Sequence, residues 1–362
     1  MSLPFNKMGL SMFRHKKRWV LILSLSLLLG GCTGLQGGEG QGVRQQGVFL
    51  KEMPKIPAAD SKAAMVPPGY KVEVAVKDLI YPTSVEFDDQ GNMYVAEAGY
   101  AYGDPVAPAR ILRIQKNGAM RYVAEQLAGP ITDLLWHQGR LYISHFRKIS
   151  ALENDGRVVD LVTDLPSTGD HQNNMMTMGP DGKIYFGQGT ATNSGVVGLD
   201  NMIPFLWLAF WPDLHDVPAK DIKLRGRTFV TPEPNNVMAK QGVLVTLSSN
   251  LGQIMSSLFN ISGPGSLLAR TGAFQPFGKH AASTAAGQTK ASGTVLRMNP
   301  DGSGLEVYAW GLRNPFGVLW GPDGRLYASD NAYDERGSRP IANALDNVWL
   351  IKENGWYGFP DY

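Results

Sequence analysis

Four segments of the chain repeat one pattern, and this repeat limits the possible folds more than any other feature. Each segment begins with an apolar stretch, turns at a glycine and continues into a short strand with a tyrosine three residues after that glycine. A glycine between two alternating strands is typical of a β-hairpin, because glycine adopts the positive φ that tight turns require. The segments are SVEFDDQGNMYVAE, DLLWHQGRLYISH, MTMGPDGKIYFGQ and VLWGPDGRLYASD, with turn glycines Gly91, Gly139, Gly182 and Gly324.

A second hairpin follows each copy, so each repeat predicts a four-stranded sheet. The second hairpins are ILRIQKNGAM, ISALENDGRVV, TVLRMNPDGSGLEVY and VWLIKENGWYGF. The first three turn glycines are 48 and 43 residues apart, which matches a propeller blade of roughly 40–50 residues. The repeat therefore predicts an all-β protein built as a β-propeller, of which about four blades are visible. The alternating stretch GYKVEVAV (69–76) predicts a lone strand ahead of the first blade.

The interval between the third and fourth turn glycines is 142 residues, roughly 100 more than the repeat requires. The excess, 195–291, falls between the two hairpins of the third blade and predicts an insert there. Segments 67–194 and 292–362 would then hold the propeller blades. The apolar run IPFLWLAFW in the insert is interpreted as the small core of an inserted subdomain. A cover over the propeller channel and a membrane contact are the alternatives.

The first 31 residues have the form of a bacterial lipoprotein signal peptide. Five basic residues precede the apolar run WVLILSLSLLL, which is too short for a comfortable membrane span. The run ends in Leu-Gly-Gly-Cys, so we expect cleavage before Cys32 and lipidation of its thiol. Segment 32–66 is expected to be a flexible tether. This predicts a protein of the bacterial cell envelope, held by its lipid on the outer side of the cytoplasmic membrane, in the periplasm or at the outer membrane.

Charge and cysteine content exclude other classes. Cys32 is the only cysteine, so internal disulfides are excluded. The formal net charge is +2, and without the basic leader it would be about −3. A chain of this charge has no electrostatic footprint for nucleic acid, and none is expected as a partner.

Three clusters of polar residues could carry chemistry, since loops at one end of a propeller channel usually form its site. His171 follows Asp170 ahead of the third GPDG-type strand, where a carboxylate can orient and tune a histidine base. Arg313 and Asn314 stand ahead of the fourth, and the guanidinium of Arg313 suits carboxylates. Each cluster could instead be structural, with a channel-wall histidine and an arginine that ties two blades together.

The loop after the fourth Tyr-containing strand is rich in oxygen ligands. Asp330, Asp334 and Asp346 lie in SDNAYDERGSRPIANALDN. Carboxylates at loose spacing suit Ca²⁺, which takes six to eight oxygen ligands. Acidic loops are also commonly just solvated.

Two stretches together resemble the glucose/sorbosone dehydrogenase family. They are GDHQNNMMTMGPDGKIYFGQGTATNSG and GLRNPFGVLWGPDGRLYASDNAYDERG with its continuation NGWYGFPDY. The resemblance covers about 67–195 and 292–362. It implies a six-bladed propeller that uses pyrroloquinoline quinone and Ca²⁺ to oxidise an aldose or sorbosone. Four visible blades would then mean that the chain is C-terminally truncated.

The resemblance also implies roles for the polar clusters. His171, beside Asp170, would remove the hydroxyl proton while hydride passes to the quinone, and Arg313 and Asn314 would lie by the quinone. The loop of Asp330, Asp334 and Asp346 would fall where the family builds its Ca²⁺ site. The expected partners are a small sugar, a membrane and an electron acceptor, either a quinone or a cytochrome. Two other functions stay open: a non-catalytic envelope propeller that binds carbohydrate or protein, and a metal-dependent lactonase.

Overall fold

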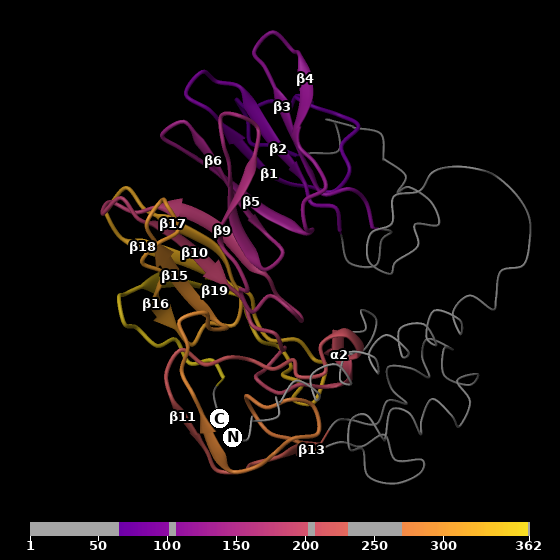
Figure 1. Cartoon of the computed structure of the whole chain (residues 1–362), viewed down its shortest axis with the longest axis vertical. Coiled ribbons are helices and arrows are strands. Elements are labelled where there is room, and N and C mark those ends of the chain that lie inside the picture. The colour runs from indigo at the N-terminus through magenta and orange to yellow at the C-terminus, as the bar shows by residue number, and fades with distance from the viewer. Residues whose placement is uncertain (1–64, 101–105, 202–206, 231–269, 361–362) are drawn as a thin grey trace, which may run out of the picture. The chain divides into compact units, whose positions relative to one another are not determined.

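The computed structural model describes residues 65–100, 106–201, 207–230 and 270–360, which are almost entirely strands and turns (Figure 1). Four antiparallel sheets follow one another along the chain, and we call them blades 1 to 4. Blades 1 and 2 are simple meanders of four strands. Their strands are β1 (Pro82–Phe87), β2 (Met93–Glu97), β3 (Arg110–Ile114) and β4 (Met120–Ala124), then β5 (Ile131–His137), β6 (Arg140–His145), β7 (Lys148–Leu152) and β8 (Val158–Val162).

Blade 3 is assembled from two distant parts of the chain. Its first hairpin precedes the insert and its second hairpin follows it, in the spatial order β16-β15-β10-β9. The strands are β9 (Asn173–Met178), β10 (Ile184–Gln188), β15 (Thr294–Met298) and β16 (Glu306–Trp310). This pairing confirms the predicted propeller-like arrangement of four all-β blades with an insert in the third.

Blade 4 has three strands where the repeat predicts four. They are β17 (Pro315–Trp320), β18 (Leu326–Asp330) and β19 (Asn347–Ile351). Beyond β19 the chain runs along blade 3 instead: Tyr357 donates its backbone N–H to Trp310, and the Trp310 N–H is bonded to Gly355. The predicted lone strand at 69–76 is also wrong, because these mostly exposed residues have no regular secondary structure and pair with no strand of the described chain.

The hairpin turns confirm the reasoning that placed them. The turn glycines of the four repeats all have φ between 72° and 80°, a conformation that L side chains seldom adopt. In blades 1, 2 and 3 the repeat tyrosine (Tyr94, Tyr142 and Tyr185) is buried. In these blades the repeat therefore combines a glycine that forms the hairpin turn with a tyrosine that packs in the core.

Neighbouring blades pack face to face through apolar clusters. One cluster joins blades 1 and 2, a second joins blades 2 and 3, and a third joins blades 3 and 4. The inner strands are also bonded directly: Asp133 on β5 accepts from the Ser84 hydroxyl on β1 (2.9 Å) and from the Met176 N–H on β9 (2.8 Å). Each blade is thus fixed against the next, so residues at the starts of the inner strands lie at defined positions.

The described part of the insert carries little regular structure. It holds the 3₁₀ turn η3 (Leu199–Asn201), the short helix α2 (Trp207–Phe210) and two small ribbons. The ribbons pair β11 (Ile222–Leu224) with β14 (Ser283–Ala285), and β12 (Phe229–Val230) with β13 (Arg270–Thr271). Leu208, Leu214 and Phe277 form a small core there with Ala191 and Val197, which agrees with the subdomain interpretation.

No helix among the described residues has the length and apolar character of a membrane span. The signal peptide (1–31), Cys32 and nearly all of the tether lie outside the described residues.

Candidate active site

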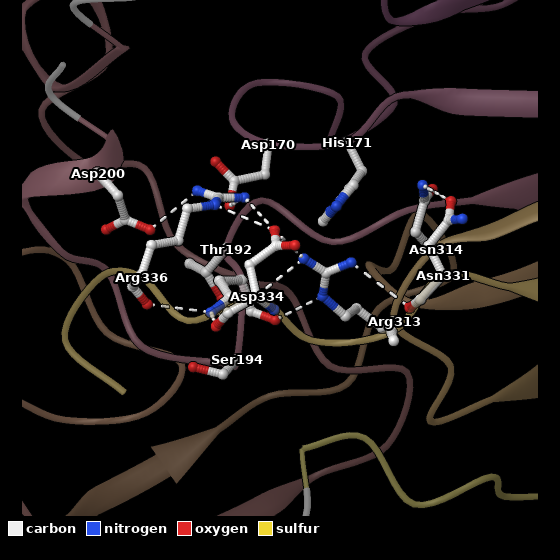
Figure 2. Close-up of polar contacts among 12 residues, drawn as sticks. Asp170, His171, Thr192, Ser194, Asp200, Arg313, Asn314, Asn331, Asp334 and Arg336 are labelled. Atoms are coloured by element: carbon white, nitrogen blue, oxygen red, sulfur yellow. Dashed lines mark hydrogen bonds and ion pairs between the residues drawn. The ribbon is translucent and has the colours of Figure 1, made fainter. Parts of the chain in front are cut away.

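Three loops meet at the starts of β9 and β17, and Figure 2 shows their polar contacts. The first is the approach to β9, with Asp170 and His171. The second follows β10 and leads into the insert. The third combines the start of β17, with Arg313 and Asn314, and the loop after β18. Residues 140 positions apart in sequence are brought into contact here, since the Asn174 side chain donates to Asn314 at 2.7 Å.

His171 is held in one tautomer by Thr190. Its Nδ1 lies 2.9 Å from the Thr190 carbonyl oxygen and 3.1 Å from the Thr190 hydroxyl oxygen. A carbonyl oxygen only accepts, so Nδ1 carries the hydrogen and Nε2 keeps its lone pair in the neutral ring. Burial, together with the positive charge of Arg313, holds the pKa of His171 well below its usual value. The ring is therefore neutral at pH 7, and its Nε2 can accept a proton.

Gly189 allows His171 and Asn314 to approach each other. A Cβ at position 189 would lie 2.4 Å from the His171 Cβ and 2.6 Å from the Asn314 Oδ1, so no other residue fits without displacing one of them. The Asn314 amide donates to the Asn331 side chain at 2.8 Å. The structure thus brings together His171, Arg313 and Asn314, three of the residues that the motifs singled out (Figure 2).

Arg313 is buried, with only 4% of its surface exposed. Its guanidinium donates to the Asn193 carbonyl (2.8 Å), to the Asn193 side chain (2.9 Å) and to Asp334 (2.9 Å). A weaker bond of 3.4 Å reaches the Asn331 carbonyl. Arg313 therefore ties blade 4 to the loop after β10, which is the structural role considered from sequence, while its charge still acts on His171.

The expected pairing of Asp170 with His171 is not what the structure shows. The Asp170 carboxylate accepts from the Asn201 amide at 3.1 Å and pairs with Arg336 at 2.9 Å. The Asp170 carboxylate is engaged by Asn201 and Arg336, so the sequence neighbours are not partners here. Thr190, which orients His171 instead, was not singled out from sequence.

Arg336 is the centre of a charged cluster that sequence analysis also missed. It pairs with Asp170 (2.9 Å), Asp200 (3.0 Å) and Asp334 (3.0 Å), and so joins blade 3, the insert and the loop after β18. Burial and the neighbouring Asp170 raise the pKa of Asp200 to about 7. Burial also raises the pKa of Asp170. In the sequence, only the charged stretch DERG (334–337) indicates this cluster.

The three carboxylates expected to bind calcium each have other hydrogen-bond or ion-pair partners. Asp330 accepts the backbone N–H groups of Arg313 (3.1 Å) and Asn314 (2.7 Å). Asp334 pairs with the two arginines, and Asp346 accepts the Ala332 N–H at 2.8 Å. Within the described ranges no group of three or more His, Cys, Asp or Glu side chains could hold a metal ion. The calcium-ligand assignment therefore has no support in this part of the chain.

Comparison with known proteins gives one curated relative of note. Quinoprotein glucose dehydrogenase B of Acinetobacter calcoaceticus is 23% identical over 205 residues, which cover 56% of this chain and 28% of that enzyme. The match thus spans less than a third of the relative's length. No protein-family model matches the chain.

Among solved structures, a putative glucose dehydrogenase of Thermus thermophilus aligns with 80% of this chain and 68% of its own, at 17% identity and a TM-score of 0.43. The PQQ-bound aldose sugar dehydrogenase of Streptomyces coelicolor aligns with 78% of this chain and 64% of its own, at 17% identity and 0.41. These likenesses are too weak to support an argument about activity. The sequence match agrees with the motifs around His171 and Arg313, so the chain is similar in sequence to a quinoprotein glucose dehydrogenase.

Proposed function

We propose that this chain carries the proton-accepting half of a sugar dehydrogenase site that uses pyrroloquinoline quinone and oxidises an aldose or a sugar aldehyde. One observation carries the proposal: in a relative of a quinoprotein glucose dehydrogenase, a neutral His171 is fixed in the Nδ1–H tautomer beside Asn314. A base of this kind contributes to catalysis when its free nitrogen reaches the proton to be removed.

The polar groups near His171 fit the carbonyl edge of a quinone. Asn314 supplies an amide nitrogen that donates one hydrogen to Asn331 and keeps a second hydrogen. Asn314, beside His171, would therefore hold that edge. Arg313 and Arg336 do not suit the cofactor's carboxylates, because both arginines are already paired with aspartates. The proposal assigns the carboxylate-binding role to no described residue.

When bound, the quinone supplies a two-electron acceptor for the hydride of the oxidised carbon. The residues of this chain accept and release the proton. The Nε2 of His171 takes the proton of the substrate hydroxyl, so that the O–H bond breaks as an N–H bond forms. The Nδ1–H stays on the Thr190 carbonyl, whose partial negative charge stabilises the imidazolium. Arg313 opposes that positive charge, so His171 is a weak base that readily releases the proton again.

Reconstitution tests this function. The full chain, in detergent, is loaded with the quinone and Ca²⁺, and dye reduction is followed with aldoses and sorbosone. His171→Ala should abolish turnover, whereas His280→Ala, which changes an exposed histidine of the insert, should leave it unchanged. Equal turnover in the two variants would refute the role of His171.

A non-catalytic propeller that binds neutral carbohydrate is the second candidate. It is favoured by the charge balance, because two arginines beside His171 face three aspartates and leave no net positive charge for an anionic cofactor. Quinone titration separates the two candidates. A micromolar dissociation constant favours the dehydrogenase, and no saturable binding favours the carbohydrate module. The lactonase alternative has no metal-ligand cluster to support it in the described chain.

We further propose that Cys32 is lipidated and places the protein in the bacterial cell envelope. The proposal rests on the leader sequence, with its basic residues, short apolar run and Leu-Gly-Gly-Cys end. Metabolic labelling with a fatty-acid analogue should mark the wild type and not Cys32→Ser. Labelling of both proteins, or of neither, would contradict lipidation.

A further inference from the structure

A two-stranded ribbon of the insert differs in charge from the rest of the protein. Its outgoing segment is 222–230, which holds β11 and β12, and its returning segment is 270–285, which holds β13 and β14 (Figure 1). These two segments contain five lysine and arginine residues and no aspartate or glutamate. The chain beyond the leader, in contrast, has a net charge of about −3. We call this element the basic ribbon.

The two segments stay in contact between their paired ends. β11 pairs with β14 at one end, and β12 pairs with β13 at the other. Between these pairs, a Cβ on Gly226 would lie 3.5 Å from the Ala282 nitrogen and 3.6 Å from the His280 carbonyl oxygen. The cations of both segments therefore belong to one element. They are Lys223, Arg225, Arg227, Arg270 and Lys279.

The charge of the basic ribbon is not compensated within the described chain. All five cations are exposed, and none forms an ion pair with a described carboxylate. Cations on the blades differ, as Lys148 pairs with Asp160 at 2.5 Å. Asp221 directly precedes the ribbon, but its carboxylate accepts the Gly287 backbone N–H at 2.8 Å. The ribbon thus presents free positive charge to its surroundings.

Apolar side chains lie among these cations. The guanidinium carbon of Arg227 is 5.2 Å from the centre of the Phe229 ring, and that of Arg339, from the loop after β18, is 6.0 Å from the same centre. Val230, the next residue of the ribbon, is 42% exposed. Basic residues beside aromatic and aliphatic ones are typical of segments that lie at a bilayer surface. Guanidinium groups also bind phosphate through two parallel N–H donors.

We propose that the basic ribbon binds the surface of a bilayer that contains anionic lipids. Each lysine or arginine near such a surface adds to the attraction, and a lipid chain with a polybasic patch binds more stably than one chain alone. A nucleic acid fits less well, because a long polyanion would also meet the acidic remainder of the protein. The proposal rests on the envelope location proposed above, where Cys32 would supply one membrane contact and the ribbon a second.

A fluorophore on the ribbon tests this contact in the full chain. Cys32 is the only cysteine, so Cys32→Ser combined with Ser283→Cys leaves one labelling position, at an exposed residue of β14. The same change removes any dependence on lipidation. The vesicles consist of phosphatidylcholine with or without phosphatidylglycerol, and a tracer lipid carries a nitroxide on its headgroup. The nitroxide quenches a label that lies at the bilayer surface.

Charge variants of this labelled protein give the matched comparison. The ribbon variant combines Lys223→Gln, Arg225→Gln and Arg227→Gln. The control removes the same charge from three exposed cations outside the ribbon that also lack an ion pair in the described chain, by Lys77→Gln, Lys116→Gln and Arg121→Gln. A third variant, Arg225→Lys with Arg227→Lys, changes two of the side chains and keeps the charge. Circular dichroism shows that each protein is folded.

The label should be quenched in vesicles with phosphatidylglycerol and not in phosphatidylcholine alone, and added salt should reduce the quenching. Loss of three ribbon cations should shift the equilibrium away from bilayer contact on the order of a hundredfold. The control and the lysine variant should behave like the parent protein. Equal quenching with both lipids, equal loss in the two triple variants, or release of the ribbon by duplex DNA at unchanged ionic strength would overturn the proposal. The measurement needs neither the quinone nor lipidation, so its failure is distinct from failure of the proposed dehydrogenase or of the lipid anchor.

Discussion

Replacing Arg336 by glutamine tests whether the charged cluster beside His171 holds the insert and the blade 4 loop together. Arg336 pairs with three aspartates, and the side chains of Asp170 and Asp200 are only 7% and 10% exposed. Removing one partner of a buried ion pair costs about 3–5 kcal/mol. Arg336 itself is 36% exposed, so solvent screening reduces the expected loss to about 2–3 kcal/mol.

The cost should depend on pH in a defined direction. The pKa of Asp200 is raised to about 7 in the folded protein, above its unfolded value of about 4. Its contribution to stability is therefore full below about pH 4 and is lost as the pH rises through 7. Without Arg336 the pKa of Asp200 rises further, so the loss continues above pH 7. Below about pH 6 Asp200 is protonated in both proteins, so its share of the cost should shrink to about 1 kcal/mol of hydrogen bonding, and the total cost of Arg336→Gln should be smaller than at high pH.

Urea unfolding of the full chain at pH 5.5 and pH 8.5 measures this difference. The matched control is Arg325→Gln, which breaks an exposed pair with Asp323 on a hairpin turn and should leave the free energy of unfolding nearly unchanged at both pH values. Adding Asp200→Asn to Arg336→Gln should recover part of the stability at pH 8.5. A cost for Arg336→Gln that does not change with pH, or that equals the control, would refute the reasoning.

Three further changes probe the blades and the histidine. Burial raises the pKa of Asp133 to about 6, so unfolding free energy should fall by about 2–3 kcal/mol between pH 4 and pH 6.5. Urea titrations of Asp133→Asn should not show this decrease in unfolding free energy. A pH dependence of stability equal to that of the wild type would contradict the raised pKa of Asp133. Gly189→Ala should separate His171 from Asn314 and lower kcat/KM by about a hundredfold, since ångström-scale misplacement has that cost. Wild-type kinetics in this variant would be inconsistent with the proposed site. Thr190→Val removes one of two acceptors of the imidazole N–H, so the kinetic pKa should fall slightly, and a rise would contradict the hydrogen-bond assignment.

The sequence predicted the blades because their signals are local. A turn glycine and an alternating strand are both read within a dozen residues, and the insert appeared as a break in their spacing. The fourth strand of blade 4 was predicted from the same local pattern and does not form. There the backbone around Gly355 bonds to Trp310 of blade 3, a tertiary contact that no local pattern encodes. The stretch at 69–76 shows the same limit. An alternating pattern indicates which residues of a strand would share a face, but it does not indicate which other strand would pair with it.

The site was predictable where a motif fixed both the residue and its place on a strand. His171, Arg313 and Asn314 stand at the starts of inner strands, and packing between blades brings those starts together. The roles of Asp170 and of the acidic loop depended on side-chain direction and on the distant Arg336. Those contacts cross from blade 3 and the insert to the loop after β18, so they follow from the fold and not from spacing.

The most direct test of the account is the protonation state of the His171 ring. Nitrogen-15 NMR of histidine-labelled full chain, with His171→Ala to assign the signals, reports both ring nitrogens as a function of pH. The account predicts a neutral ring at pH 7 with hydrogen on Nδ1 and a bare Nε2, and titration only well below the usual histidine pKa. An imidazolium at pH 7, or a neutral ring with hydrogen on Nε2, would contradict it.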